Sequence, residues 1–570
     1  MDSEKYVSCP FDVLPRKDPV NNCSRFHMLY IPSAVIFSQS SDDHSSYPSN
    51  PTSLVSIIED SNSEEVVIHR RGEQIVEDSS ACSTIVPCTE WLLRLSGIGQ
   101  LHQQVAIGTL PDEVLLKIFK FFVSEIFSYY CRRERWPKLV HVCRRWRNLA
   151  FTFPRHLNLQ LVCKSPKRSV KRMLDIWPEE LPVYILEFDL PLKGAVDNVV
   201  AALKLNHRVS VIRFDKTTRW ETFAPLMEHS FPVLTHLWVR PRLSIADPIS
   251  RSFLGGSAPC LRDLVLIGIP FPALPELLLS ATNLVRLLYN NIPRSGYIPQ
   301  AMATGLSALT HLESLSLIFQ PPPDLPDRAI RNPRPHTRTL LPTLTNLHFR
   351  GVPEYMEDLV SQIDAPLLEG IEITLFDQEV LKVSQLAKFV RRADSLSLID
   401  QAEVTFNATS VSVSLSPEFH GINPKTLTLR LQCSEEDLRL SHLVQFCASC
   451  LPTLSPFECL RIIAQPGYNR YTWRDVVDNP DPQWLELLRL FNTVKDLGLT
   501  KIVALRAAQV LRRLPAEQVS EVLPALDAVF ILGLEPFGPV WEAISEFADM
   551  RQLSGHPVSI SDWERTMQEN

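Results

Sequence analysis

The chain has 570 residues, a hydrophobic fraction of 45% and a net charge of −7 at pH 7. This length excludes a single small core, so several units or one extended array are expected. Proline is frequent, at 45 residues, while glycine is scarce, at 18, which argues against flexible low-complexity sequence and favours many rigid turns. No long uncharged apolar run is present, so the sequence predicts no membrane span.

The twelve cysteines are scattered along the chain, a pattern typical of reduced thiols rather than of a disulfide framework. Cys447 and Cys450 form a lone C-x-x-C pair without a second pair at the spacing of a zinc finger. We therefore expect no metal site and no cofactor. The first residues, MDSEKYVSCPFD, lack a basic region followed by an apolar core, so no secretory signal is predicted. Together these features predict a cytoplasmic or nuclear location.

Residues 1–88 carry little periodic pattern and are rich in serine and acidic residues. Examples are SQSSDDHSSYPSNPTS at 38–53 and EDSNSEE at 59–65. Sequence of this kind cannot bury enough apolar surface to offset the entropy of ordering the backbone. We therefore expect a disordered N-terminal tail.

The stretch 108–152 predicts a small module of short amphipathic helices. Pro111 occupies a first helical turn, where proline is tolerated, and Asp112 and Glu113 lie at the positive end of the helix dipole. Apolar residues then recur with the helical period. They are Val114, Leu115, Ile118, Phe119 and Phe122 in the first helix, and Trp136, Leu139, Val142, Cys143, Trp146, Leu149 and Ala150 in the second. Two such helices cannot cover all of this surface alone, so the rest of the chain or a partner must do so.

The pattern L-P-x-E-V-L-x-x-I-F, followed by L-x-x-V-C-R-x-W-R-x-L-A, resembles the F-box. The resemblance implies a module that docks on a Skp-type adaptor and, through it, on the cullin scaffold of a ubiquitin ligase. The positions implied in adaptor binding are Leu110, Pro111, Glu113, Val114, Leu115, Ile118, Phe119, Leu139, Val142, Cys143, Trp146 and Leu149. The connection at 123–135 is longer than is usual for the family, and an ordinary two-helix corner of a larger domain remains the alternative interpretation.

A basic segment overlaps the second half of this module. Residues 131–172 contain 13 Lys and Arg residues and one acidic residue, Glu134. Such a segment fits an acidic protein partner, a nucleic-acid surface or a solvated basic face. We favour a protein partner and keep nucleic-acid binding as an alternative function.

From 153 to 552 a segment of the form L-x-x-L-x-L recurs. Its clear copies begin at residues 234, 261, 284, 312, 344 and 368, and weaker copies begin at 393, 424, 457, 494 and 526. The last three positions alternate inward, outward and inward, as in a short strand. Helix-like stretches follow at 275–281, 356–363 and 380–393. Repeated strand-plus-helix units stack into a solenoid.

This repeat pattern resembles leucine-rich repeats and implies an α/β solenoid. It lacks the asparagine usual after the strand, whose place is held by Arg242, Ile269, Ile292 and Gln320, so an irregular solenoid is expected. The alternative is a non-repetitive, leucine-rich α/β domain. Residues 553–570 are expected to form a polar tail.

In a solenoid, the middle residue of each L-x-L triplet points away from the core. These residues are Trp238, Val265, Leu288, Ser316, His348, Glu372 and Thr428. Tryptophan and arginine are enriched among binding hot spots. The candidate target surface therefore consists of Trp238, Arg240, Arg286, His348, Arg350 and Arg430, with the proline-rich segment 320–336 as the next surface to consider.

No nucleophile elbow, phosphate-binding loop or zinc-protease motif is present in the sequence, so no enzymatic activity is expected. The sequence favours a substrate-recognition adaptor whose F-box-like module docks to a Skp-type adaptor and whose repeats hold an unknown protein target for ubiquitylation. The alternatives are a protein-binding scaffold without a ligase role and a nucleic-acid binder that uses residues 131–172.

Overall fold

The structure is a computed structural model. It describes residues 107–124, 136–154, 156–157, 159, 161–163, 170, 172, 174, 177–188, 195–244, 247–292, 299–321, 338–376, 381–393, 400–417, 426–432, 436–450, 456–465, 482–533 and 538–562. These residues belong to one compact unit that spans Gln104–Asn570. The expected disordered tail at 1–88 and the proline-rich loop at 322–336 lie outside the described residues.

A helical module comes first in the described chain. It comprises the 3-10 helix η2 (Ile107–Thr109) and the α-helices α2 (Asp112–Ser124), α3 (Trp136–Val140) and α4 (Arg144–Thr152). Its core is a cluster of buried apolar side chains that extends into the first strand. The buried members are Leu115, Phe119, Trp136, Leu139, Val140, Leu149, Ala150, Leu157, Leu159, Leu161 and Leu181. The module therefore shares one core with the segment that leads into the sheet.

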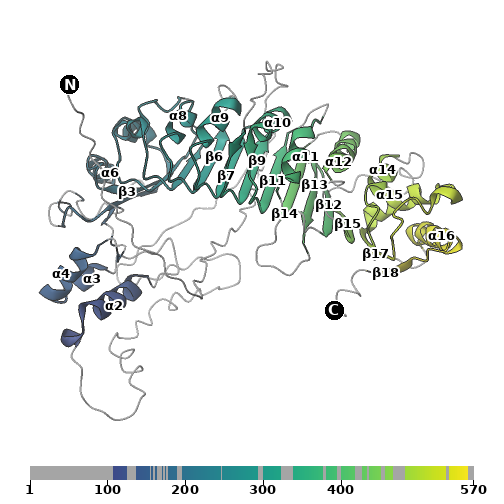
Figure 1. Cartoon of the computed structure of the whole chain (residues 1–570), viewed down its shortest axis with the longest axis horizontal. Helices are drawn as coiled ribbons and strands as arrows, with labels where there is room; N and C mark the ends of the chain where they lie inside the picture. The colour runs from purple at the N-terminus through teal and green to yellow at the C-terminus, as the bar shows by residue number, and fades with distance from the viewer. Residues whose placement is uncertain are drawn as a thin grey trace, which may run out of the picture. The chain divides into compact units, whose positions relative to one another are not determined.

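A long mixed sheet forms the rest of the fold (Figure 1). The strands are β1 (Leu161–Cys163), β2 (Val183–Phe188), β3 (Val209–Thr217), β4 (His236–Pro241), β5 (Asp263–Ile267), β6 (Arg286–Ile292), β7 (Ser314–Phe319), β9 (Asn346–Gly351), β11 (Gly370–Leu375), β12 (Gln401–Asn407), β13 (Ser410–Ser416), β14 (Thr426–Gln432), β15 (Cys459–Ala464), β16 (Asp496–Thr500), β17 (Ala528–Leu532) and β18 (Ser559–Asp562). Neighbouring strands pair in parallel except for β12 with β13 and β13 with β14. Two short strands, β8 (Thr339–Leu340) and β10 (Ile363–Asp364), form a separate parallel pair.

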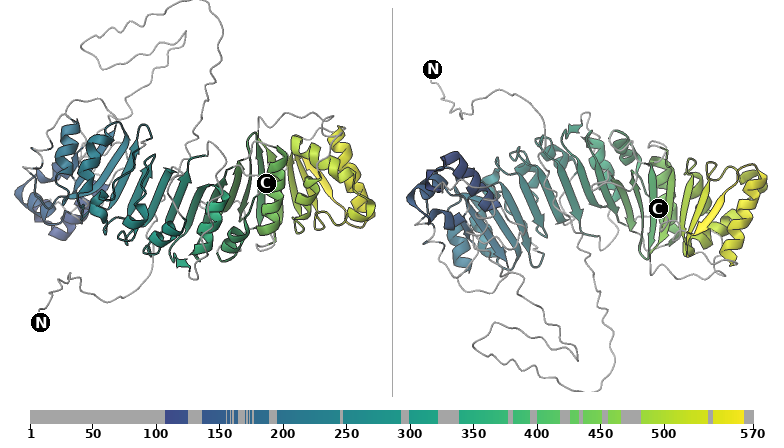
Figure 2. Two further views of the ribbon diagram at one scale, coloured as in Figure 1. Left: turned by 90° about the horizontal axis from the view of Figure 1, so that it is seen from above. Right: turned by 90° about the horizontal axis from the view of Figure 1, so that it is seen from below.

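Helices cover one face of this sheet (Figures 1 and 2). They are α6 (Ala195–Leu203), α7 (Trp220–Phe223), η3 (Ala224–Glu228), η4 (Phe253–Gly256), α8 (Leu274–Leu278), α9 (Pro299–Leu306), α10 (Pro353–Gln362), α11 (Ser384–Arg391), α12 (Glu436–Cys450), α14 (Gln483–Arg489), α15 (Lys501–Arg512), η7 (Ala516–Gln518) and α16 (Pro539–Leu553). Successive helices contact one another in the order of the chain, as the pairs α8–α9, α9–α10, α10–α11 and α15–α16 show. The fold is thus an α/β solenoid made of stacked strand-plus-helix units.

The parallel register explains why the leucine pattern builds a core. It aligns Leu237 with Leu264, Leu264 with Leu287, and so on through the sheet. The aligned residues form one row of buried side chains, Leu237, Leu264, Leu287, Leu315, Leu347, Ile371 and Leu427, and a second row two residues later, Val239, Leu266, Tyr289, Leu317, Phe349, Ile373 and Leu429. Each unit therefore covers the apolar face of the next one.

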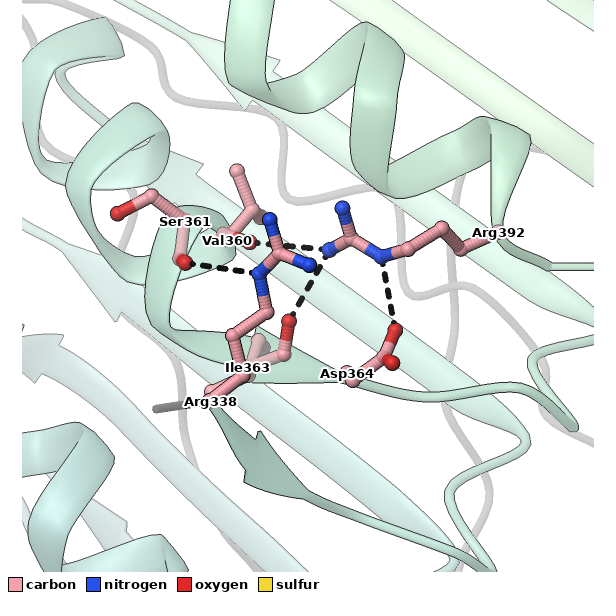
Figure 3. Close-up of polar contacts among 6 residues, drawn as sticks. All are labelled: Arg338, Val360, Ser361, Ile363, Asp364 and Arg392. Carbon is pink, nitrogen blue, oxygen red and sulfur yellow. Dashed lines mark hydrogen bonds and ion pairs between the residues drawn. The ribbon is translucent and has the colours of Figure 1, made fainter. Parts of the chain in front are cut away.

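Polar contacts also tie neighbouring units together, most clearly between α10 and α11 (Figure 3). Arg392, just after α11, donates to the carbonyl oxygens of Val360 and Ile363 at the end of α10 and pairs with Asp364 at 2.8 Å. In the opposite direction, Glu357 of α10 accepts hydrogen bonds from backbone N–H groups at the start of α11. The cation lies at the carbonyl end of one helix and the carboxylate at the N–H end of the other, as the helix dipoles favour.

The described strands extend beyond the predicted repeats. Three strands, β1 to β3, precede the first clear copy at residue 234, and β18 lies within 553–570, the stretch where we expected a polar tail. The antiparallel hairpin β12–β13 separates β14 from β15. The weak copy at 393–398 lies almost entirely outside the described residues. In the part of the chain described, no helix is long and apolar enough to cross a membrane.

Candidate protein-binding surfaces

The helices of the N-terminal module divide their apolar residues between its own core and its surface. Leu115 and Phe119 are completely buried, and Leu139 and Leu149 are nearly so. Trp146 is half-buried, and its ring centroid lies 4.8 Å from that of Phe119. These five residues, all among the predicted adaptor-binding positions, therefore hold the module together.

Three apolar residues of α2 form an exposed stripe, whereas Leu116, Phe122 and Val123 are partly buried against the core. Val114, Ile118 and Phe121 keep 40%, 43% and 52% of their surface accessible, and Val142, in the turn before α4, keeps 59%. We call the three residues of α2 the module stripe. Phe121 was absent from the predicted set, although its position seven residues after Val114 and three after Ile118 follows the helical period. Exposed apolar side chains grouped in this way mark an interaction surface.

The other predicted adaptor-binding positions of the module lie at the N-terminal ends of α2 and α4. Pro111, Glu113 and Cys143 are exposed and Leu110 is partly buried. Arg145 of α4 connects the two helices, since its guanidinium donates to the Leu110 carbonyl oxygen at 2.6 Å and to the carboxylate of Asp112 at 2.6 Å. The sequence pattern gave no sign of this contact, because it joins residues 33 or more positions apart.

The face of the sheet that points away from the helices carries the predicted target surface. The strand register places the outward residues of neighbouring strands in continuous rows. The central row reads Arg213, Trp238, Val265, Leu288, Ser316, His348, Glu372, Thr428 and Ser414. We call this side of the sheet the open face. Among its predicted outward residues, Val265 and Ser316 are buried, at 2% and 6% exposure.

Trp238, Arg240 and Arg286 of the predicted target surface each contact a charged side chain within the fold. The Arg213 guanidinium lies 4.7 Å from the centroid of the Trp238 ring, a cation–π arrangement. Arg240 pairs with Asp215 on β3, with Nε and Oδ1 2.7 Å apart. Arg286 pairs through Nε and Nη2 with the carboxylate of Asp263 on β5. In both ion pairs an aspartate of the preceding strand neutralises the arginine.

Arg350 and Arg430 have a different environment. Arg350 is half-buried, its guanidinium lies 5.5 Å from the Phe376 ring, and its nearest polar partner is the neutral side chain of Gln432 at 3.5 Å. Burial, with a smaller contribution from the Arg430 charge, lowers the pKa of Arg350. Neither arginine forms an ion pair with any residue that the structure describes. This part of the open face therefore carries uncompensated positive charge.

His348 lies beside these arginines on the open face. Its Nδ1 is 3.2 Å from the Ser316 hydroxyl, within hydrogen-bonding distance. Burial lowers the pKa of His348, and the Glu372 carboxylate opposes that shift. The neutral imidazole is therefore favoured near pH 7. The predicted surface thus separates into Trp238, Arg240 and Arg286 on β4 and β6, and His348, Arg350 and Arg430 on β9 and β14.

The basic segment 131–172 is described only in part. Arg145 is engaged as stated above, and Arg147 donates to the Val140 carbonyl oxygen at 2.9 Å. Lys138 and Arg144 are exposed. Cys447 and Cys450 are buried in α12, where desolvation raises the pKa of both thiols. Within the described ranges no three His, Cys, Asp or Glu side chains gather as a metal site would require.

Comparison with known proteins adds little to this geometry. No protein-family model matches the chain, and no curated protein matches it. Among solved structures, the leucine-rich repeat-containing protein LegL7 from Legionella pneumophila aligns with 57% of this chain and 94% of its own, at 11% identity and a TM-score of 0.19.

Proposed function

We propose that this chain is a target-recognition subunit that binds one protein through its helical module and a second through the open face of its solenoid. In this proposal the module is an F-box, its partner is a Skp-type adaptor joined to a cullin scaffold, and the second protein is presented for ubiquitylation. The observation that carries the proposal is the division of α2, whose Leu115 and Phe119 fill the module's own core while Val114, Ile118 and Phe121 stay exposed.

The division of α2 matters because apolar side chains grouped on one exposed face of a helix mark an interaction surface, whereas isolated ones do not. Ile118 and Phe121 are about half-exposed, so a partner that covered them would gain roughly half of the 1.5–3 kcal/mol available per large apolar side chain. For the two together this corresponds to about 10–100-fold in affinity. That contribution is large enough to measure by substitution.

The adaptor hypothesis is tested with two matched double variants of α2. Ile118→Ser with Phe121→Ser removes two residues of the module stripe, and Lys117→Ser with Lys120→Ser alters two exposed positions beside them. The purified chain is titrated with a purified Skp-type adaptor, and circular dichroism checks the fold. We expect the first variant to lose at least about tenfold in affinity and the control to bind like the parent chain. A parent chain that does not bind the adaptor would refute the F-box assignment.

A protein-binding scaffold without a ligase role would use the same two surfaces as the proposed ligase subunit, but it would not lead to ubiquitylation of the bound protein. Reconstitution with adaptor, cullin and transfer enzymes distinguishes the two, because only the ligase subunit would direct ubiquitin to the bound protein. The physical basis of that activity is proximity, since holding target and transfer machinery together raises their effective concentration.

Nucleic-acid binding through residues 131–172 is the remaining alternative. It predicts affinity for DNA or RNA that falls steeply with salt, because each phosphate contact releases counterions. Arg145 and Arg147 of this segment are already engaged within the module, which leaves fewer free cations than the sequence suggests. A titration of labelled oligonucleotide at several salt concentrations tests it directly.

A further inference from the structure

The open face carries four predicted binding arginines, and the structure divides them into two classes. Arg240 and Arg286 each have an aspartate in the adjacent strand. Arg350 and Arg430 have none among the described residues. In the register around them, the directly paired outward residues are neutral: Ile318 and Thr374 for Arg350, and Thr374 and Ser412 for Arg430.

The surroundings of this arginine pair are rich in groups that donate hydrogen bonds. Thr374 of β11 lies between the two arginines in the register. Thr428 and Ser414 lie one row away, with their hydroxyl oxygens 3.2 Å apart. Thr374 and Ser412 are 8% and 7% exposed, so they form a floor beneath the longer arginine side chains. β9 and β14 flank β11, which places the two arginine Cα atoms about 10 Å apart.

The carboxylate of Glu372 lies diagonally next to both arginines in the strand register. The residue paired with Glu372 on β9 is His348. The Glu372 charge acts on His348, and no ion pair joins it to either arginine. The site therefore keeps one net positive charge when His348 is neutral. The Nε of Arg350, like those of Arg213 and Arg240 on the same face, is buried without a hydrogen-bond acceptor among the described residues. Arg350 differs from Arg240 in having no aspartate beside it.

We propose that Arg350 and Arg430 form a subsite that binds carboxylate side chains of an acidic, unmodified segment of the target protein. This inference rests on the proposed use of the open face for protein binding and adds the chemistry of the partner. A carboxylate accepts two parallel hydrogen bonds from one guanidinium, and the hydroxyls of Thr374 and Ser412 lie beside the arginines in the register. Paired arginines such as Arg240 and Arg286 would have to release an aspartate first, so they do not compete for this role.

The test uses fluorescence anisotropy with the full chain and three labelled probe peptides. One alternates Glu with Ala, the second has Gln in place of Glu, and the third has phosphoserine in place of Glu. The double variant Arg350→Glu with Arg430→Glu is compared with a control of equal charge change, Lys388→Glu with Arg391→Glu, at exposed positions of α11. The single exposed substitution Arg430→Gln provides a milder variant, and thermal unfolding checks that each protein is folded.

We expect the Glu-Ala peptide to bind the parent chain more tightly than the Gln-Ala peptide does. Its affinity should fall about tenfold or more in the arginine double variant and by less in Arg430→Gln. In the control, the affinity should fall only by the general effect of the added negative charge. Equal binding of the Glu and Gln peptides, or equal losses in the two double variants, overturns the subsite. Binding of the phosphoserine peptide alone overturns it in favour of phosphate recognition. If Trp238→Ala weakens binding of the Glu-Ala peptide while the arginine double variant does not, protein binding by the open face stands and the acidic subsite fails.

Discussion

Replacing Tyr289 by phenylalanine would test how the solenoid fixes the connection between β5 and α8. Tyr289 lies on the inward side of β6 and is fully buried. Its hydroxyl accepts a hydrogen bond from the backbone N–H of Phe271 at 2.9 Å and donates one to the carbonyl oxygen of Ile269 at 3.1 Å. The substitution preserves the ring and its packing but leaves both backbone groups without this partner.

A buried donor or acceptor left unpaired costs about 1–3 kcal/mol. Two such groups at one site, with some relaxation of the loop, should lower the free energy of unfolding by about 2–4 kcal/mol. Urea denaturation followed by circular dichroism measures this change, and hydrogen exchange of residues 268–290 locates it, because stability in a solenoid depends mainly on contacts between adjacent units. A loss below about 0.5 kcal/mol, or faster exchange spread evenly over the sheet, would refute the reasoning.

Three further perturbations probe the helix layer and the open face. Gly305→Ala should destabilise the fold by about 1–3 kcal/mol in urea titrations, because the added Cβ would lie 2.8 Å from the Pro275 backbone oxygen; equal or higher stability would contradict that contact. Glu357→Ala should cost about 1–2 kcal/mol, seen as faster hydrogen exchange at the start of α11, whose two N–H groups lose their acceptor; Glu357→Gln should recover part of it. The pKa of His348 is lowered in the fold, so the neutral imidazole adds to the free energy of unfolding. That contribution is complete above the unfolded pKa of about 6.5 and is lost as the pH falls below this value. His348→Asn should flatten the decline in stability at low pH, and an unchanged pH profile of stability would contradict this prediction.

The sequence predicted the repeated strands well, because the alternating leucines of the L-x-L triplet follow the two-residue period of a strand. Leu237, Leu264 and Leu287 lie in the described core in the expected inward positions. The helix-like stretches after the strands also match α8, α10 and α11. Both signals are local, since they depend on side-chain alternation within a few residues.

The antiparallel hairpin β12–β13 was missed even though its signal was present. Residues 410–416 read SVSVSLS and follow a short polar turn, a pattern typical of a hairpin strand with one buried face. The leucine-based template ignored it because valine and phenylalanine fill the inward positions. The strands β1 to β3 were not predicted for the same reason, since their inward residues include Val183, Ile185 and Phe214.

The proposed interaction sites were harder to predict, because burial and charge compensation depend on pairing across strands. Spacing showed that Val265 and Ser316 point away from the helices but not that both are nearly inaccessible. For the module, spacing identified the apolar residues of α2 without separating Leu115, which is buried, from Ile118, which is exposed. That separation depends on where α4 packs, and the Arg145 contact that joins the two helices spans more than 30 residues of sequence.

Charge compensation on the open face also depends on pairing across strands, and it affects which partner the face can bind. Arg286 and Arg350 look equivalent in the sequence, each on the outward side of a strand. The register places Asp263 beside Arg286 and Ile318 beside Arg350, so one charge is compensated within the fold and the other is not. An exposed or half-exposed ion pair adds little to stability, whereas an unpaired, half-buried guanidinium carries a desolvation cost that a bound carboxylate can relieve. We therefore expect an acidic partner to bind at β9 and β14, where the two predicted arginines have no ion-pair partner among the described residues.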